Sequence, residues 1–161
     1  MRIRLADYVA DFLVSHGVTD VFSVVGGGAM HLNDAFGHQE GLKITYNHHE
    51  QACTIAAEGY TRQTGKIAPV CVTGGPGGTN AITGVFGAYV DSIPMFVVTG
   101  QAKRETTVWS TNLPLRQLGD QEVNITSAVS TMTKYAKMIT DPMSIRKEVE
   151  KAWFLMLNGR P

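Results

Sequence analysis

Short runs of β-branched and other apolar residues recur along the chain, and each ends in a turn that leads into a helical pattern. Continuous runs of this kind are typical of strands buried on both faces of a parallel sheet. The predicted strands cover residues 18–25, 43–46, 67–73, 94–99 and 133–138. The predicted helices cover residues 3–16, 30–36, 49–65, 79–89 and 122–129, and a last helix opens at Asp141-Pro142. This alternation predicts an α/β fold: a doubly wound, mostly parallel sheet of about six strands with helices on both faces.

The charge balance narrows the choice of partners. A length of 161 residues suits one domain with a sizeable core, and 14 basic and 14 acidic residues give a formal net charge of zero. That balance favours neither nucleic acid nor an anionic membrane surface as a partner. Charged residues make up 17% of the chain, against about a quarter in typical domains. We therefore expect other protein to cover part of the surface; an ordinary compact enzyme domain with few charges is the alternative.

Cysteine usage and the N-terminal segment predict the compartment. Cys53 and Cys71 form no CxxC pair and lie inside apolar elements, which predicts two buried free thiols in a reducing compartment. Residues 1–7 contain no apolar core of signal-peptide length, and no apolar run approaches the ~18 residues of a membrane span. The sequence therefore predicts a cytoplasmic protein without a membrane partner.

An acidic residue opens the helix predicted over residues 49–65. Glu50 lies in its first turn, where exposed backbone N–H groups and the helix dipole favour negative charge. Small and apolar residues follow it: Ala52, Ile55, Ala56, Ala57 and Gly59. They predict a face that another backbone can approach closely and an apolar surround for the carboxyl group. Open α/β sheets bind ligands at such strand–helix switches; a solvated acid at a helix start is the alternative.

Two glycine-rich turns follow predicted strands. Gly26-Gly27-Gly28 lets a backbone come close to a ligand, with a simple tight turn as the alternative. The second turn, residues 73–80, reads Thr-Gly-Gly-Pro-Gly-Gly-Thr-Asn. It lacks the Gly-Lys-Ser/Thr of a P-loop, and Asn80 occupies the third glycine position of the dinucleotide fingerprint, so a nucleotide site is poorly supported. The five histidines show no zinc-ligand spacing, and we predict no metal ligands in this chain.

These motifs, in this order, resemble the pyrimidine-binding domain of thiamine-diphosphate-dependent enzymes, most of all the acetolactate synthase group. Asp91-Ser92-Ile93-Pro94 and Thr99-Gly100-Gln101 extend the match, which covers essentially all 161 residues. The resemblance implies that Glu50 is the catalytic residue, because the matching Glu of the family hydrogen-bonds N1′ of the cofactor's aminopyrimidine. It implies cofactor-binding roles for Val25, Gly26, Glu50, Thr73, Pro76 and Asn80. Val25 stands where the family often has proline.

The stretch 101–121 lacks clear periodicity and is predicted to be a long loop of the kind that usually carries function. The synthase branch has a Gln-Glu pair at the position of Gln121-Glu122, and its Gln lies near the substrate. Gln121 is therefore the predicted substrate-binding residue, with an ordinary surface loop residue as the alternative. Asp120 replaces the aromatic residue that often precedes that Gln.

The resemblance also implies what lies outside this chain. Residues 1–161 match the first of about three family domains, so we expect a fragment of a larger enzyme that is inactive alone. In the family, Mg²⁺ and the diphosphate are held by another domain, usually across a dimer interface. The whole protein is expected to be a homodimer or homotetramer.

The expected reaction is the decarboxylation of a 2-oxo acid and the joining of the product to a second carbonyl compound, in branched-chain amino acid biosynthesis. Two alternatives stay open. One is another thiamine-diphosphate enzyme, such as an oxidase, a decarboxylase or a ring-opening hydrolase. The other is a non-catalytic α/β ligand-binding domain.

Overall fold

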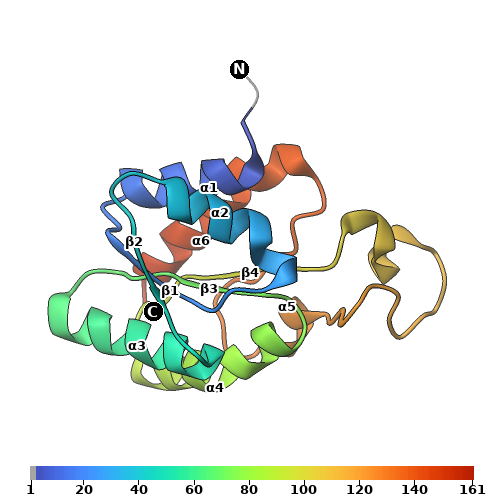
Figure 1. Ribbon diagram of the computed structural model, residues 1–161. Coiled ribbons are helices and arrows are strands. Elements are labelled where there is room, and N and C mark those ends of the chain that lie inside the picture. Colours follow the sequence, from blue (N-terminus) through green and yellow to red (C-terminus); the bar gives the residue numbers. More distant parts are fainter. Residues whose placement is uncertain (1–2) are drawn as a thin grey trace.

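Four parallel strands form the centre of the described part of the chain. The computed structural model describes residues 3–161. Residues 1 and 2, which belong to the N-terminal segment 1–7 considered above as a signal peptide, lie outside the described residues. The strands are β1 (Asp20–Ser23), β2 (Lys43–Tyr46), β3 (Val70–Val72) and β4 (Val97–Thr99). They pair in the order β2-β1-β3-β4, and each pair is parallel (Figure 1).

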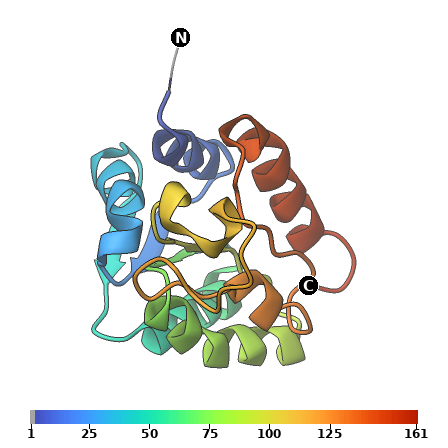
Figure 2. The same cartoon turned by 90° about the vertical axis from the view of Figure 1, so that its right-hand side faces the viewer.

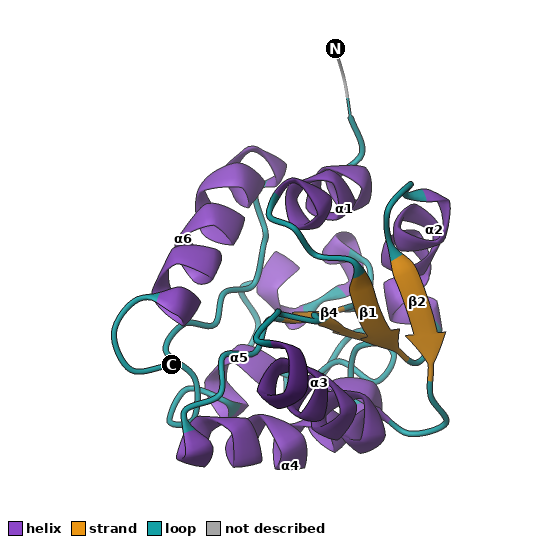
Figure 3. Cartoon of the chain, turned by 90° about the vertical axis from the view of Figure 1, so that its left-hand side faces the viewer, coloured by secondary structure: helices purple, strands orange, loops and turns teal. Residues whose placement is uncertain are grey.

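Helices cover both faces of this sheet. They are α1 (Leu5–Ser15), α2 (Met30–His38), α3 (Glu50–Thr64), α4 (Pro76–Asp91), α5 (Ile125–Ala128) and α6 (Ile145–Leu157). Figure 3 shows α1, α2 and α6 on one face and α3 and α4 on the other. The predicted α/β class, with helices on both faces of a parallel sheet, is confirmed. No helix within residues 3–161 combines the length and the apolar character needed to cross a membrane.

Strand β3 shows why these runs become parallel strands. Its three residues are fully buried, because Cys71 packs with the core under α1, α2 and α6 while Val70 and Val72 pack with the core under α3 and α4. Burying one such side chain stabilises the fold by roughly 1.5–3 kcal/mol. Both cysteines are free and buried, as predicted. Burial raises the pKa of the Cys71 thiol to about 12.

The predicted number of about six strands is wrong for residues 3–161, because four strands are present there and residues 133–138 form none. A strand needs a neighbour within hydrogen-bonding reach. Strand β4 pairs with β3 on one side only, and a largely apolar cavity of about 380 Å³ is lined by β4, residues 133–139 and α6. Residues 133–139 make no backbone hydrogen bond to β4 in the described chain, so they pass by without joining the sheet.

Other boundaries move for local reasons. Helix α4 begins at Pro76, three residues before its predicted start, because proline suits the first helical position. The helix predicted over 122–129 shortens to α5, where the Asn124 side chain caps the N–H of Ser127 at 3.1 Å. Asp141 is the predicted cap, and its carboxylate accepts from Met143 N at 3.0 Å at a short 3₁₀ turn before α6. The long loop is confirmed, with two 3₁₀ turns inside it.

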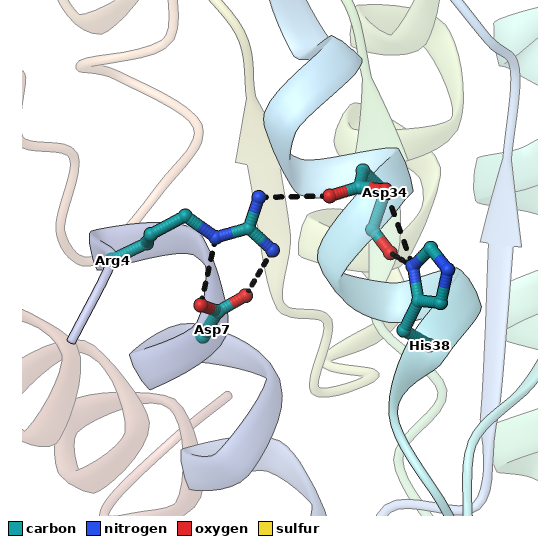
Figure 4. Close-up of polar contacts among 4 residues, drawn as sticks. All are labelled: Arg4, Asp7, Asp34 and His38. Carbon is teal, nitrogen blue, oxygen red and sulfur yellow. Dashed lines mark hydrogen bonds and ion pairs between the residues drawn. The ribbon is translucent and has the colours of Figure 1, made fainter.

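A surface network joins the first two helices (Figure 4). The Arg4 guanidinium donates to both carboxylate oxygens of Asp7, at 2.7 and 2.8 Å, and to Asp34 at 2.8 Å. His38 lies 3.2 Å from the same Asp34 carboxylate. The hydrogen bonds from Arg4 lower the pKa of Asp7. Because these groups are solvated, the network orients α1 and α2 more than it stabilises them.

Helices α3 and α4 meet in a regular register on their face of the sheet. The pairs in contact are Glu50–Asn80, Thr54–Gly84, Glu58–Gly87 and Arg62–Asp91. A Cβ atom placed on Gly84 would lie only 2.0 Å from Thr54 Oγ1. Glycine at this position is therefore what lets the two helices approach closely.

We predict that Gly84→Ala lowers the free energy of unfolding by about 1–3 kcal/mol, the usual cost of overpacking. Gly87→Ala is the matched control in the same helix, because its Cβ would lie 3.5 Å from Glu58 Oε2, an ordinary contact. That control should gain up to about 1 kcal/mol from helix propensity. Urea denaturation monitored by circular dichroism measures both. Equal shifts in the two variants would contradict the close Thr54–Gly84 contact.

Candidate functional site

The candidate site lies at the carboxyl ends of β1 and β3. The strand order reverses direction between these two strands, and ligands bind at such switch points in open α/β sheets. The turn after β1 and the turn after β3 are joined directly, because Gly28 N donates to Thr73 Oγ1 at 3.0 Å. Thr73 is thus the first predicted site residue that the structure places at the switch point.

Backbones pack against each other and against Thr73 at this edge of the sheet. A Cβ atom on Gly26 would lie 2.5 Å from Thr73 Cβ, and one on Gly77 would lie 2.6 Å from Thr73 Cγ2. A Cβ on Gly100 would lie 2.2 Å from the carbonyl oxygen of Gly28. No side chain fits at these positions without a shift. The result is a surface made of backbone around one threonine.

Glu50 is the first residue of α3, and its carboxylate reaches the first turns of α4. Asn80 Nδ2 donates to Glu50 Oε2 at 3.0 Å. Glu50 Oε1 makes no protein hydrogen bond within residues 3–161, and it lies 3.3 Å from the position of a Cβ on Gly77. The first turns of two helices, α3 and α4, therefore meet at this one carboxylate. The preceding His49 caps α3, since its Nδ1 accepts from Gln51 N at 3.2 Å.

The apolar surround predicted for Glu50 is incomplete within residues 3–161, because Ala57 alone of the small and apolar residues named above is fully buried there. Ala52 and Gly59 are exposed, and Ile55 is 53% exposed, so the small and apolar face of α3 points largely to solvent. The face that is buried consists of Cys53, Thr54, Ala57 and Thr61. Side chains at i, i+3 and i+4 share a helix face, and the sheet and α4 take the face that begins at Cys53.

Two predicted cofactor-binding residues are exposed at the rim of the site. The Val25 side chain is 64% exposed just beyond the end of β1. Pro76 is exposed at the first position of α4, where its carbonyl oxygen accepts from Thr79 Oγ1 at 3.1 Å. The structure therefore brings Gly26, Glu50, Thr73 and Asn80 together and places these two beside them without a bond to Glu50.

Gln121 lies against the turn that starts α4. A Cβ atom on Gly75 would lie 2.3 Å from the Gln121 carbonyl oxygen and 2.8 Å from its Cβ. Gln121 has a φ of 53°, which is unusual for a residue other than glycine. The predicted substrate residue is thus adjacent to the predicted cofactor-binding turn, although the two are 46 positions apart in the sequence.

Two residues near the site, Gln101 and Glu122, had no role predicted from the sequence. Gln101 donates to the Val123 carbonyl oxygen at 3.0 Å, and Glu122 accepts from several backbone N–H groups of the long loop. Both belong to motifs that the sequence marked. Their partners are backbone groups, which have no residue signature, so the pattern gave no sign of what these side chains hold.

Comparisons with known proteins give one family match and several similar proteins. The family described as "Thiamine pyrophosphate enzyme, N-terminal TPP binding domain" matches residues 3–128. The acetolactate synthase large subunit of Lactococcus lactis is 37% identical over 145 residues, which are 90% of this chain and 24% of that protein. The chloroplastic acetolactate synthase of Arabidopsis thaliana is 33% identical over 159 residues, 97% of this chain and 22% of that protein. The chain spans about a quarter of the length of these relatives.

We predict that Thr73→Ser makes Gly77→Ala tolerable. Alone, Gly77→Ala should cost about 1–3 kcal/mol of unfolding free energy, because the new methyl group meets Thr73 Cγ2. Serine removes that methyl group and keeps the oxygen that accepts from Gly28 N. Urea denaturation of the four proteins in the cycle should show a coupling of roughly 0.5–3 kcal/mol.

Gly27→Ala serves as the control for this cycle, since no heavy atom lies within 4 Å of its Cβ position. Additive effects of Thr73→Ser and Gly77→Ala would show that Thr73 does not fill the space between the two turns.

Proposed function

Because this chain belongs to the thiamine pyrophosphate enzymes, whose N-terminal TPP-binding domain matches residues 3–128, we propose that it holds the pyrimidine end of thiamine diphosphate in a larger, acetolactate synthase-like enzyme. The observation that carries this proposal is the placement of Glu50. Its carboxylate lies at the N-termini of α3 and α4, with one oxygen bonded to Asn80 and the other left without a protein partner in residues 3–161.

The residues at the site fit one edge and the faces of a flat nitrogen ring. Glu50 Oε1 is the oxygen that a ring nitrogen needs as a hydrogen-bond partner. Gly26 and Gly77 present backbone on either side of Thr73, and side chains there would meet that residue. We infer that Val25 and Pro76 complete the rim of this site.

Thiamine diphosphate, when bound, supplies a thiazolium C2 that acts as a carbon nucleophile toward carbonyl compounds. Glu50 holds or moves the proton at N1′ of the aminopyrimidine. Asn80 fixes the orientation of the carboxylate through the bond to Oε2. Positioned acid–base groups of this kind contribute roughly 10²–10⁴ in rate.

The rest of the proposal concerns the whole protein. We propose a three-domain enzyme that decarboxylates a 2-oxo acid and joins the product to a second carbonyl compound, with a role in branched-chain amino acid biosynthesis. Mg²⁺ and the diphosphate are held outside residues 1–161. The support is that the relatives are acetolactate synthases about four times as long as this chain. A cytoplasmic location stays a prediction, since the Arabidopsis thaliana relative is chloroplastic.

Assembly through α3 and α4 is also part of the proposal. The outer faces of these helices carry Ile55, Phe86 and Val90, which are 53%, 52% and 50% exposed. Large apolar side chains gathered on one face are typical of protein–protein contacts. We infer that a homodimer or homotetramer covers them in the complete enzyme.

We predict that Glu50→Gln in the complete enzyme slows exchange of the cofactor C2 hydrogen by roughly 10²–10⁴, because the amide keeps one hydrogen bond to N1′ but delivers no proton. The affinity for thiamine diphosphate should change little. Incubation in D₂O followed by acid quench and NMR isolates this step from substrate chemistry.

Glu58→Gln is the matched control on the same helix. The Glu58 carboxylate lies two turns from Glu50 and pairs with Arg62 at 2.7 Å, so its variant should exchange at the parent rate. Exchange in Glu50→Gln as fast as in the parent, with cofactor saturated, would refute the catalytic role of Glu50.

A further inference from the structure

The carboxylate of Glu122 closes the long loop after β4. Val108 N donates to Oε1 at 2.9 Å and to Oε2 at 3.0 Å. Gly119 N and Leu118 N donate to Oε2 at 3.0 and 3.2 Å. Both ends of the segment 108–119 are therefore tied to one side chain. The segment stands away from the sheet as a loop of its own in Figure 1 and lies in front of the sheet in the view of Figure 2.

Glu122 is held as an anion by this arrangement. Partial burial raises the pKa of its carboxyl group, but the backbone N–H groups of Gly119, Val108 and Leu118 together outweigh that effect and leave the pKa lowered. Backbone N–H groups form stronger hydrogen bonds to an ionised carboxylate than to a neutral acceptor. The loop closure therefore depends on the charge of Glu122 as well as on its shape.

Gln101 holds the same stretch from the other side. Its Nε2 donates to the Val123 carbonyl oxygen at 3.0 Å, and its Oε1 accepts from Ala102 N at 2.9 Å. Residues 119–123 are thus fixed between the end of β4 and the closed loop.

Gln121 lies in the middle of this fixed stretch. Its left-handed backbone conformation is one that a residue with a side chain keeps only where the surroundings impose it. The next residue, Glu122, is bonded to three backbone N–H groups, and the Gln121 carbonyl oxygen lies close to Gly75 at the start of α4. The Gln121 amide, with two donors and an acceptor, suits the carboxylate and carbonyl oxygens of a 2-oxo acid.

We propose that Glu122 is a positioning residue for the carbonyl substrate: by closing the loop 108–119 it holds Gln121 against Gly75 and so aims the Gln121 side chain at the substrate. This inference rests on the proposed function. A positioning role differs from a purely structural role, because a purely structural residue would change stability without changing how the substrate is bound.

The test uses the complete enzyme with pyruvate as the probe. Glu122→Gln should lower kcat/KM by roughly 10- to 100-fold, mainly through KM, because small misplacements of a positioning group cost up to ~10². The affinity for thiamine diphosphate and the exchange rate of its C2 hydrogen should stay at the parent values. Glu105→Gln is the control, because Glu105 is an exposed carboxylate of the same loop whose side chain makes no hydrogen bond in the described chain.

A double-mutant cycle then asks whether Glu122 acts through Gln121. In a Gln121→Ala background, Glu122→Gln should have little further effect on KM, because the group that it positions is already gone. If the effects of Glu122→Gln and Gln121→Ala on KM multiply in the double variant, the inference is overturned. A KM equal to that of the parent in Glu122→Gln would overturn it as well.

The cycle is paired with backbone hydrogen exchange over residues 105–123, which needs no substrate. Exchange should accelerate in Glu122→Gln and not in Glu105→Gln, and unchanged exchange would overturn the positioning role whatever the substrate. If the parent enzyme accepts no 2-oxo acid, that result counts against the proposed function. Accelerated backbone hydrogen exchange in Glu122→Gln would in that case still support the hold of Glu122 on Gln121.

Discussion

The packing of backbone on backbone at the carboxyl edge of the sheet is the constraint on which the site depends. The turns after β1, β3 and β4 approach so closely that a methyl group at Gly26, Gly77 or Gly100 would overlap its neighbour. Thr73 fills the space between Gly26 and Gly77, and its hydroxyl oxygen ties the first turn to the second. Because the surface is made of backbone, its shape is set by the strand order and varies little with side-chain rotamers.

Much of this architecture was predictable because it depends on short-range patterns. Buried strands such as β3 are continuous apolar runs, and glycines, Pro76 and Asp141 mark where elements begin or end. Residues 133–138 were not predictable in the same way, because their sequence suits a strand but a ladder requires a partner at the right distance. Local propensity decides what a segment is able to form, and its neighbours decide what it forms.

The same distinction between local pattern and distant neighbours applies to the candidate site. Glu50 was identifiable from its place at a helix start, whereas its bond to Asn80 joins residues 30 positions apart and required the fold. The orientation of α3 could not be predicted, since small residues lie on its buried side, at Cys53 and Ala57, and on its exposed side, at Ala52 and Gly59. The roles of Glu122 and Gln101 could not be predicted for a chemical reason. Both side chains bind backbone groups, which every residue carries, so the sequence gives no sign of the partners.

The register between α3 and α4 has a consequence for how such a site tolerates change in length. Glu50 and Thr54 are four residues apart on one helix, and their partners Asn80 and Gly84 are four apart on the other. Each residue advances a helix by about 100°. One inserted or deleted residue between Glu50 and Thr54 would therefore turn the carboxylate away from Asn80. Residues 109–117 lie between the two backbone attachments to Glu122 and can take up extra length without moving that closure. Variation in chain length across relatives should thus collect in that loop and avoid the first turns of both helices.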